Sequence, residues 1–210
     1  MVEVLERAGC QVEFRENQTC CGQPAFNSGY REDAARVAEH FLRVFEGAEY
    51  IVTPSGSCAA MIAHHFPRRP SGLPQKLPVW EFSQFLTSVL GVEDVGARLD
   101  RVVTYHDGCH ALRELKIKDA PRRLLANVRG LRLAEMDAAE ECCGFGGTFS
   151  VKFPGISGAI ARTKLDSIAR TGADMVVSTD ASCLMQIQGA LRRAGSSVQT
   201  MHLAEVLASR

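Results

Sequence analysis

The stretches Thr19-Cys20-Cys21-Gly22 and Glu141-Cys142-Cys143-Gly144 share a Cys-Cys-Gly motif, and the rest of the chain is organised around them. Adjacent cysteines rarely form a disulfide with each other, because a trans peptide does not readily give the required separation and dihedral angle. Two neighbouring thiolates can instead reach different metal atoms, while the glycine lets backbone N–H groups approach the bound centre. We therefore interpret each stretch as half of an iron–sulfur site.

The cysteine spacing repeats along the chain. Cys142 lies 122 residues after Cys20 (142 minus 20), and Cys183 lies 125 residues after Cys58 (183 minus 58). Each half also has the same order of elements: the Cys-Cys-Gly loop, a helix, a strand, a turn, a cysteine and another helix. These matches indicate a duplication. Alternating strands and helices predict an α/β fold built from two parallel-sheet, Rossmann-like βαβ halves.

Hydrophobic periodicity and turn residues predict the individual elements. Helices are expected over 1–8, 31–46, 58–66, 79–90, 111–128 (in two pieces because of Pro121), 159–170, 183–193 and 202–208. Strands are expected over 10–15, 50–53, 101–106, 131–134, 174–178 and 198–200. Residues 67–78 are rich in proline and predict a connector. The expected division is a first half over 1–78, a helix and linker over 79–98, and a second half over 99–210.

The second half holds a complete set of candidate metal ligands, which are Cys109, Cys142, Cys143 and Cys183. The first half holds Cys20, Cys21 and Cys58, which we assign to a second site. Cys109 precedes Cys142 by 33 residues (142 minus 109), and its first-half counterpart would lie before Met1. The first half is therefore expected to lack its opening strand and its first cysteine.

Other residues near these motifs allow other interpretations. Cys10 is expected to be a small core residue, as buried cysteines usually are. His106 and His110 lie beside Cys109, and we expect them to form hydrogen bonds around the site rather than to bind metal. Four thiolates could also bind zinc, although the usual CxxC knuckles are missing. A third interpretation is that the cysteines themselves perform thiol–disulfide chemistry.

Composition excludes several classes of protein. The 210-residue chain is 46% hydrophobic and carries 24 basic and 24 acidic residues, so it lacks the net positive charge of a typical nucleic-acid-binding protein. It has no apolar run long enough to span a membrane and no signal-peptide pattern at its start. Eight cysteines without an export signal favour a reducing compartment, and we expect a cytoplasmic protein.

The motif segments resemble the CCG cysteine-rich domain found in heterodisulfide reductases, the glycolate oxidase iron–sulfur subunit and lactate utilisation protein A. The segments that carry this resemblance are 18–30, 54–58, 141–149 and 181–185, and the last of the three branches is the most similar. The heterodisulfide reductase pattern ends in CxxC, whereas Met61 and Gln186 occupy the final positions here.

This resemblance implies an iron–sulfur protein of the 4Fe-4S kind, with the seven motif cysteines divided between the two sites named above. It implies an electron-transfer subunit that works with partner subunits in the oxidation of L-lactate to pyruvate, without a substrate-activating base of its own. The alternatives are a heterodisulfide-reductase-like thiol/disulfide oxidoreductase subunit and a non-enzymatic, zinc-stabilised assembly module.

Overall fold

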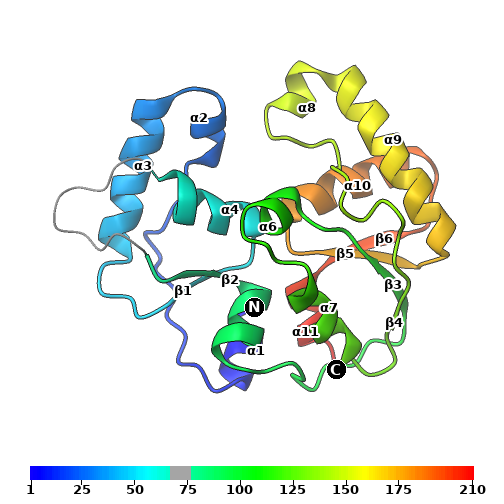
Figure 1. The fold of residues 1–210 in the computed structure, drawn as a ribbon, viewed down its shortest axis with the longest axis horizontal. Helices are drawn as coiled ribbons and strands as arrows, with labels where there is room; N and C mark the ends of the chain where they lie inside the picture. Colours follow the sequence, from blue (N-terminus) through cyan, green and yellow to red (C-terminus); the bar gives the residue numbers. More distant parts are fainter. Residues whose placement is uncertain (67–76) are drawn as a thin grey trace.

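The computed structural model describes residues 1–66 and 77–210, and it contains two parallel sheets covered by helices (Figure 1). Most of the predicted connector lies outside the described residues. The helices are α1 Val2–Arg7, α2 Gln23–Asn27, α3 Arg31–Val44, α4 Gly56–Ala60, α5 Phe82–Gln84, α6 Cys109–Arg113, α7 Asp119–Ala126, α8 Phe149–Lys152, α9 Pro154–Thr171, α10 Ala181–Arg193 and α11 Leu203–Ala208. Two π-helical turns, η1 Met61–His65 and η2 Phe85–Val89, extend α4 and α5.

The larger sheet belongs to the second half and has the strand order β4-β3-β5-β6. Its strands are β3 Val102–Tyr105, β4 Arg132–Leu133, β5 Met175–Ser178 and β6 Gln199–His202, and all neighbouring pairs are parallel. Every residue of β5 is buried. Because the strands are parallel, their carboxyl ends lie along one edge, where the loops that follow β3 and β5 meet.

The smaller sheet belongs to the first half and pairs β1 Ile51–Thr53 with β2 Val79–Glu81 in parallel. It corresponds to β5 and β6, since in each case a strand, a helix, a parallel strand and a short helix follow in that order. The α/β fold with parallel strands is therefore confirmed, and the arrangement agrees with two duplicated halves.

The two halves share one hydrophobic core. Helix α1 and the segment α5–η2 come from the first part of the chain, and they pack against α7, α11 and the strands of the larger sheet. Phe82 and Leu86 are fully buried there, and Cys10 packs against the edge of the same core. Burying a side chain of this size stabilises a fold by about 1.5–3 kcal/mol, so this core holds the halves together.

Two local predictions differ from the structure, and a third is confirmed with its break in another place. Residues 10–15 form no strand, since no neighbouring strand pairs with them in the described chain and Phe14 is exposed. A helix was expected over 79–90, but residues 79–81 form strand β2, whose backbone is paired with β1. The helix expected in two pieces over 111–128 is present as α6 and α7, but the break precedes Pro121, which lies in the first turn of α7, where proline is tolerated. No helix of the described chain is both long and apolar enough to cross a membrane.

Candidate metal centre

Glycine is required in both Cys-Cys-Gly loops. Gly22 and Gly144 have φ angles of +83° and +88°, in the left-handed region that favours glycine. A Cβ on Gly144 would lie 2.6 Å from the carbonyl oxygen of Ser157, so the loop lies directly against α9. The N–H of Gly144 donates a hydrogen bond to Sγ of Cys142 at 3.3 Å. The sharp bend of the loop thus points the backbone N–H of Gly144 toward the thiol of Cys142.

The four cysteines of the second half, which we call the second cysteine cluster, come from three separate segments: the start of α6, the second Cys-Cys-Gly loop and the first turn of α10. Sγ of Cys143 and Sγ of Cys183 lie within 4.8 Å of each other and of a ring nitrogen of His106. Cys142 is joined to Cys143 by a side-chain hydrogen bond, and Cys109 lies close enough to Cys142 for their charges to repel. Cys143 and Cys183 are buried, while Cys109 and Cys142 are half-buried.

Three thiols of this cluster, those of Cys109, Cys142 and Cys143, resist losing their protons in the absence of a cation. The hydrogen bond from Cys142 lowers the pKa of Cys143, but the bond to Cys183 and burial outweigh it and raise this pKa to about 12. The hydrogen bond to Cys143 and burial raise the pKa of Cys142, and burial raises that of Cys109. Crowded, desolvated thiolates become stable when a bound cation neutralises them, which is the usual state of a metal site.

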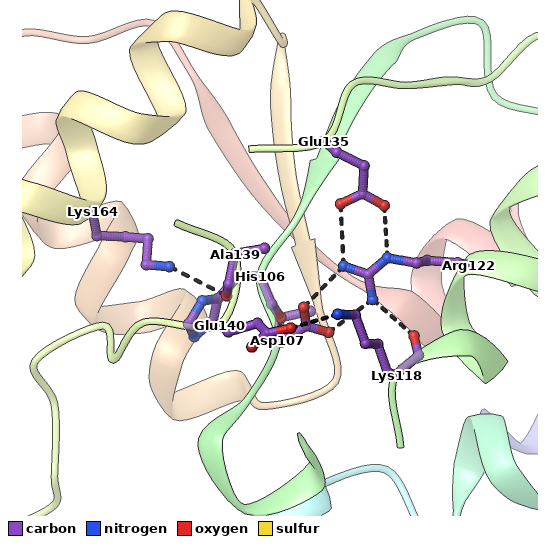
Figure 2. A network of polar contacts seen from close by, with 9 residues as sticks. His106, Asp107, Lys118, Arg122, Glu135, Ala139, Glu140 and Lys164 are labelled. Atoms are coloured by element: carbon purple, nitrogen blue, oxygen red, sulfur yellow. Dashed lines mark hydrogen bonds and ion pairs between the residues drawn. The ribbon is translucent and has the colours of Figure 1, made fainter. Parts of the chain in front are cut away.

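His106 and Lys164 lie at the same place, and each side chain is 1% exposed. His106 directly follows strand β3, and neither ring nitrogen makes a hydrogen bond of acceptable geometry among residues 1–66 and 77–210. Burial, aided by the charge of Lys164, lowers the pKa of His106 to about 3. Lys164 reaches from α9 toward His106 and donates to the carbonyl of Ala138 and, at 3.3 Å, to that of Ala139 (Figure 2).

We expected His106 to form hydrogen bonds around the site, and its surroundings in the structure do not agree with that expectation. A histidine that forms hydrogen bonds around the site would have a partner on at least one nitrogen, and none is found in the described chain. Lys164 was not expected at the site at all. Burial lowers its pKa, while the charges of Glu141 and Cys143 act in the opposite direction. A buried ammonium group beside several thiols is suited to offset the negative charge of a metal–thiolate centre.

A buried ion pair fixes the end of strand β3 beside the cluster. Asp107 accepts two hydrogen bonds from Arg122, both at 2.9 Å, and Arg122 also binds Glu135 (Figure 2). The N–H of Asp107 donates to the carbonyl of Ala139 at 3.1 Å. This network attaches the loop before Cys142 to the strand that carries His106, so the ligand-bearing segments hold their relative positions.

The first half brings together two of its three candidate ligands. Sγ of Cys21 and Sγ of Cys58 lie 3.5 Å apart, whereas Cys20 is exposed. The hydrogen bond from Cys21 lowers the pKa of Cys58 to about 7, and the same bond raises the pKa of Cys21. This pair, which we call the first cysteine pair, therefore has one thiol that readily becomes a thiolate.

Asp180 links the two halves between these sites. It precedes α10 and is 2% exposed. Its Oδ1 accepts hydrogen bonds from Oγ of Ser55 at 2.6 Å and from the N–H of Ser57 at 3.1 Å, at the start of α4. Gly108 lies so close that a Cβ there would be 2.1 Å from Oδ2. One buried carboxylate thus contacts the loops that carry Cys58 and Cys109.

The comparison with protein families agrees with this arrangement. The model described as "CCG: Cysteine-rich domain" matches residues 1–63 and 103–188, which include all seven motif cysteines. The chain belongs to the CCG cysteine-rich domain family. The matched segments lie within the two halves expected from the repeat, and the resemblance inferred from the motifs is confirmed.

Several curated CCG proteins resemble this chain over its whole length. "Lactate utilization protein A" of Bacillus cereus (strain G9842) is 48% identical over 219 residues, covering 100% of this chain and 90% of the relative. The proteins of the same name from Bacillus cytotoxicus and Geobacillus sp. (strain WCH70) are 49% and 48% identical, with 90% and 91% of the relative covered.

Proposed function

We propose that this chain is an iron–sulfur electron-transfer subunit of a cytoplasmic complex that oxidises L-lactate to pyruvate. The observation that carries the proposal is the convergence of Cys143, Cys183 and His106, buried and within 4.8 Å of one another, beside Cys142. Soft thiolate ligands in a buried site favour iron–sulfur centres or zinc over magnesium and calcium. The names of the relatives support the link to lactate.

The residues of the site fit such a centre. When bound, an iron–sulfur centre accepts and passes on electrons, at a potential set by its surroundings. The thiolates of the second cysteine cluster would hold the iron. The N–H of Gly144 points at a ligand sulfur, and the ammonium group of Lys164 compensates negative charge. We place the step on lactate itself in a partner subunit.

Metal analysis tests this proposal directly. The wild-type chain, purified under anaerobic conditions, is expected to contain iron and inorganic sulfide in matching amounts and to give an EPR signal on reduction. Replacing Cys183→Ser is expected to remove the iron of the second half, because Cys183 is buried at the centre of the ligand set. The matched control is Cys10→Ser, which changes a cysteine at the edge of the shared core and leaves the iron content unchanged.

Three results would overturn the proposal. Stoichiometric zinc without iron would favour the assembly-module interpretation, since zinc has no redox chemistry. Unchanged iron and sulfide in Cys183→Ser would show that the metal is bound elsewhere. In the complete complex, L-lactate is expected to reduce the iron of this chain, and a complex that oxidises lactate at the normal rate with the Cys183→Ser variant would exclude an electron-relay role.

The first cysteine pair favours a second candidate function, that of a thiol–disulfide oxidoreductase. Sγ of Cys21 and Sγ of Cys58 are 3.5 Å apart, and a thiol with a pKa of about 7 is well suited to attack a disulfide. Oxidation by an added disulfide would join the two sulfurs, with both protons and two electrons passing to the disulfide, which is released as two thiols. Mass spectrometry after treatment with oxidised glutathione tests this: a reversible Cys21–Cys58 bond supports it, and two freely alkylated thiols exclude it.

A further inference from the structure

The buried imidazole of His106 is unusual in its surroundings. Both ring nitrogens are buried and unpartnered within the described part of the chain, although the residue lies at the functional edge of the larger sheet. A buried polar group without a partner costs about 1–3 kcal/mol. Such a group in a native structure has a functional role or a partner, such as a water or an ion, that the protein atoms alone do not provide.

The neighbouring protein groups are already occupied. The carbonyl of Ala139 accepts from the N–H of Asp107 at 3.1 Å and from Lys164 at 3.3 Å. Asp107 itself is paired with Arg122. The backbone of Ala139 lies near the ring and opposes the fall of its pKa, but the ring makes no hydrogen bond of acceptable geometry with the described residues. The sulfurs of Cys143 and Cys183 lie within 4.8 Å of a ring nitrogen.

The position of His106 matches that of a ligand. It comes from the end of β3, while Cys143 comes from the second Cys-Cys-Gly loop and Cys183 from the first turn of α10. Three donor atoms from three elements thus surround one point. The Asp107–Arg122 ion pair fixes the backbone next to the histidine, as is common for residues that orient metal ligands.

We propose that His106 is a direct ligand of the iron held by Cys143 and Cys183, which gives the second-half centre a mixed sulfur and nitrogen ligand set. The inference rests on the proposed function, because it requires that the second cysteine cluster holds iron. A centre with a neutral nitrogen at one iron position carries one negative charge fewer than a centre with a further thiolate at that position, which raises its reduction potential. The centre would then accept electrons more readily than one bound by cysteine alone.

The test uses the full chain, labelled with ¹⁵N-histidine and purified anaerobically. Pulsed EPR of the reduced protein is expected to show hyperfine coupling to a labelled histidine nitrogen. This coupling is lost in His106→Ala and in His106→Cys, and the cysteine variant keeps its iron because it supplies a sulfur donor at the same place. If the reduced centre gives no EPR signal, iron-edge X-ray absorption makes the same comparison, with a nitrogen neighbour in the wild type and none in His106→Cys.

The matched control is His110→Ala. His110 is half-buried, its Nδ1 lies 3.5 Å from Sγ of Cys109, and its other nitrogen contacts Gln23 at 3.3 Å. The nitrogen signal is expected to persist in this variant. Iron and sulfide without a histidine nitrogen signal in the wild type, or a signal that survives in His106→Cys, would overturn this inference and leave the proposed function standing. A wild-type protein without iron would overturn the proposed function instead.

Discussion

Replacing Gly144→Ala is expected to destabilise the second half far more than the same change three residues later. An alanine at the φ of +88° observed for Gly144 costs about 1–2 kcal/mol, because left-handed backbone is unfavourable for residues with a Cβ. The new Cβ would also lie 2.6 Å from the carbonyl oxygen of Ser157, which belongs to the backbone of α9 and does not move easily. Overpacking of this kind costs about 1–3 kcal/mol. The expected loss is therefore about 3 kcal/mol.

Gly147→Ala is the matched control, since Gly147 also has a positive φ, of +63°, but no atom lies within 4 Å of its added Cβ. The expected loss there is about 1 kcal/mol, from the backbone alone. Urea unfolding of the metal-free variants measures both free energies, and iron analysis of the anaerobically purified proteins measures site formation. Gly144→Ala is expected to hold less iron, because the N–H that points at Cys142 shifts. Equal small losses in both variants would refute the claim that the loop must lie against α9.

Further predictions concern three buried charged groups. Asp180→Ala is expected to lower the free energy of unfolding by about 1.5–3 kcal/mol, because the N–H of Ser57 loses a charged acceptor. An unchanged midpoint of urea unfolding would contradict the role of Asp180 in joining the two halves. Arg122→Met should cost about 3–5 kcal/mol by leaving Asp107 buried and unpaired, and a second change, Asp107→Asn, should recover part of the loss; no recovery would count against the ion pair. Burial raises the pKa of Glu81 from 4.5 to about 7, so the stability linked to its proton is present below pH 4.5 and is lost as the pH rises to 7. Glu81→Gln should remove about 3 kcal/mol of this pH-dependent change in the free energy of unfolding. Parallel profiles of stability against pH in the variant and the wild type would refute the assignment.

Much of the architecture can be predicted from repetition and periodicity. The paired motifs, the similar placing of Cys58 and Cys183 after them and the apolar stripe of α3 are patterns visible in the sequence, and these are preserved in the folded chain. Residues 10–15 have the alternation of a strand but no partner to pair with in the described chain. Pairing depends on distant segments, so local alternation alone does not determine it.

The charged and polar parts of the site are harder to predict. Lys164 lies three residues after Ala161 and four before Ile168, which places it on the inner stripe of α9. That spacing was a usable signal, but a lysine is normally expected on the outside of a helix. His106 is surrounded by loops that lie far from it in sequence, and its lack of a hydrogen-bond partner among the described residues becomes visible only when those loops fold over it.

The contact between Ser55 and Asp180 has an evolutionary consequence. The two residues are 125 positions apart (180 minus 55), the same interval that separates Cys58 from Cys183, so they occupy equivalent places in the repeat and touch each other. In a symmetric dimer of identical halves, both places would carry the same side chain, and two carboxylates would repel there. Joining the copies in one chain removes that restriction. The hydroxyl of Ser55 and the carboxylate of Asp180 then form an asymmetric contact between the halves, so the two copies can diverge in sequence.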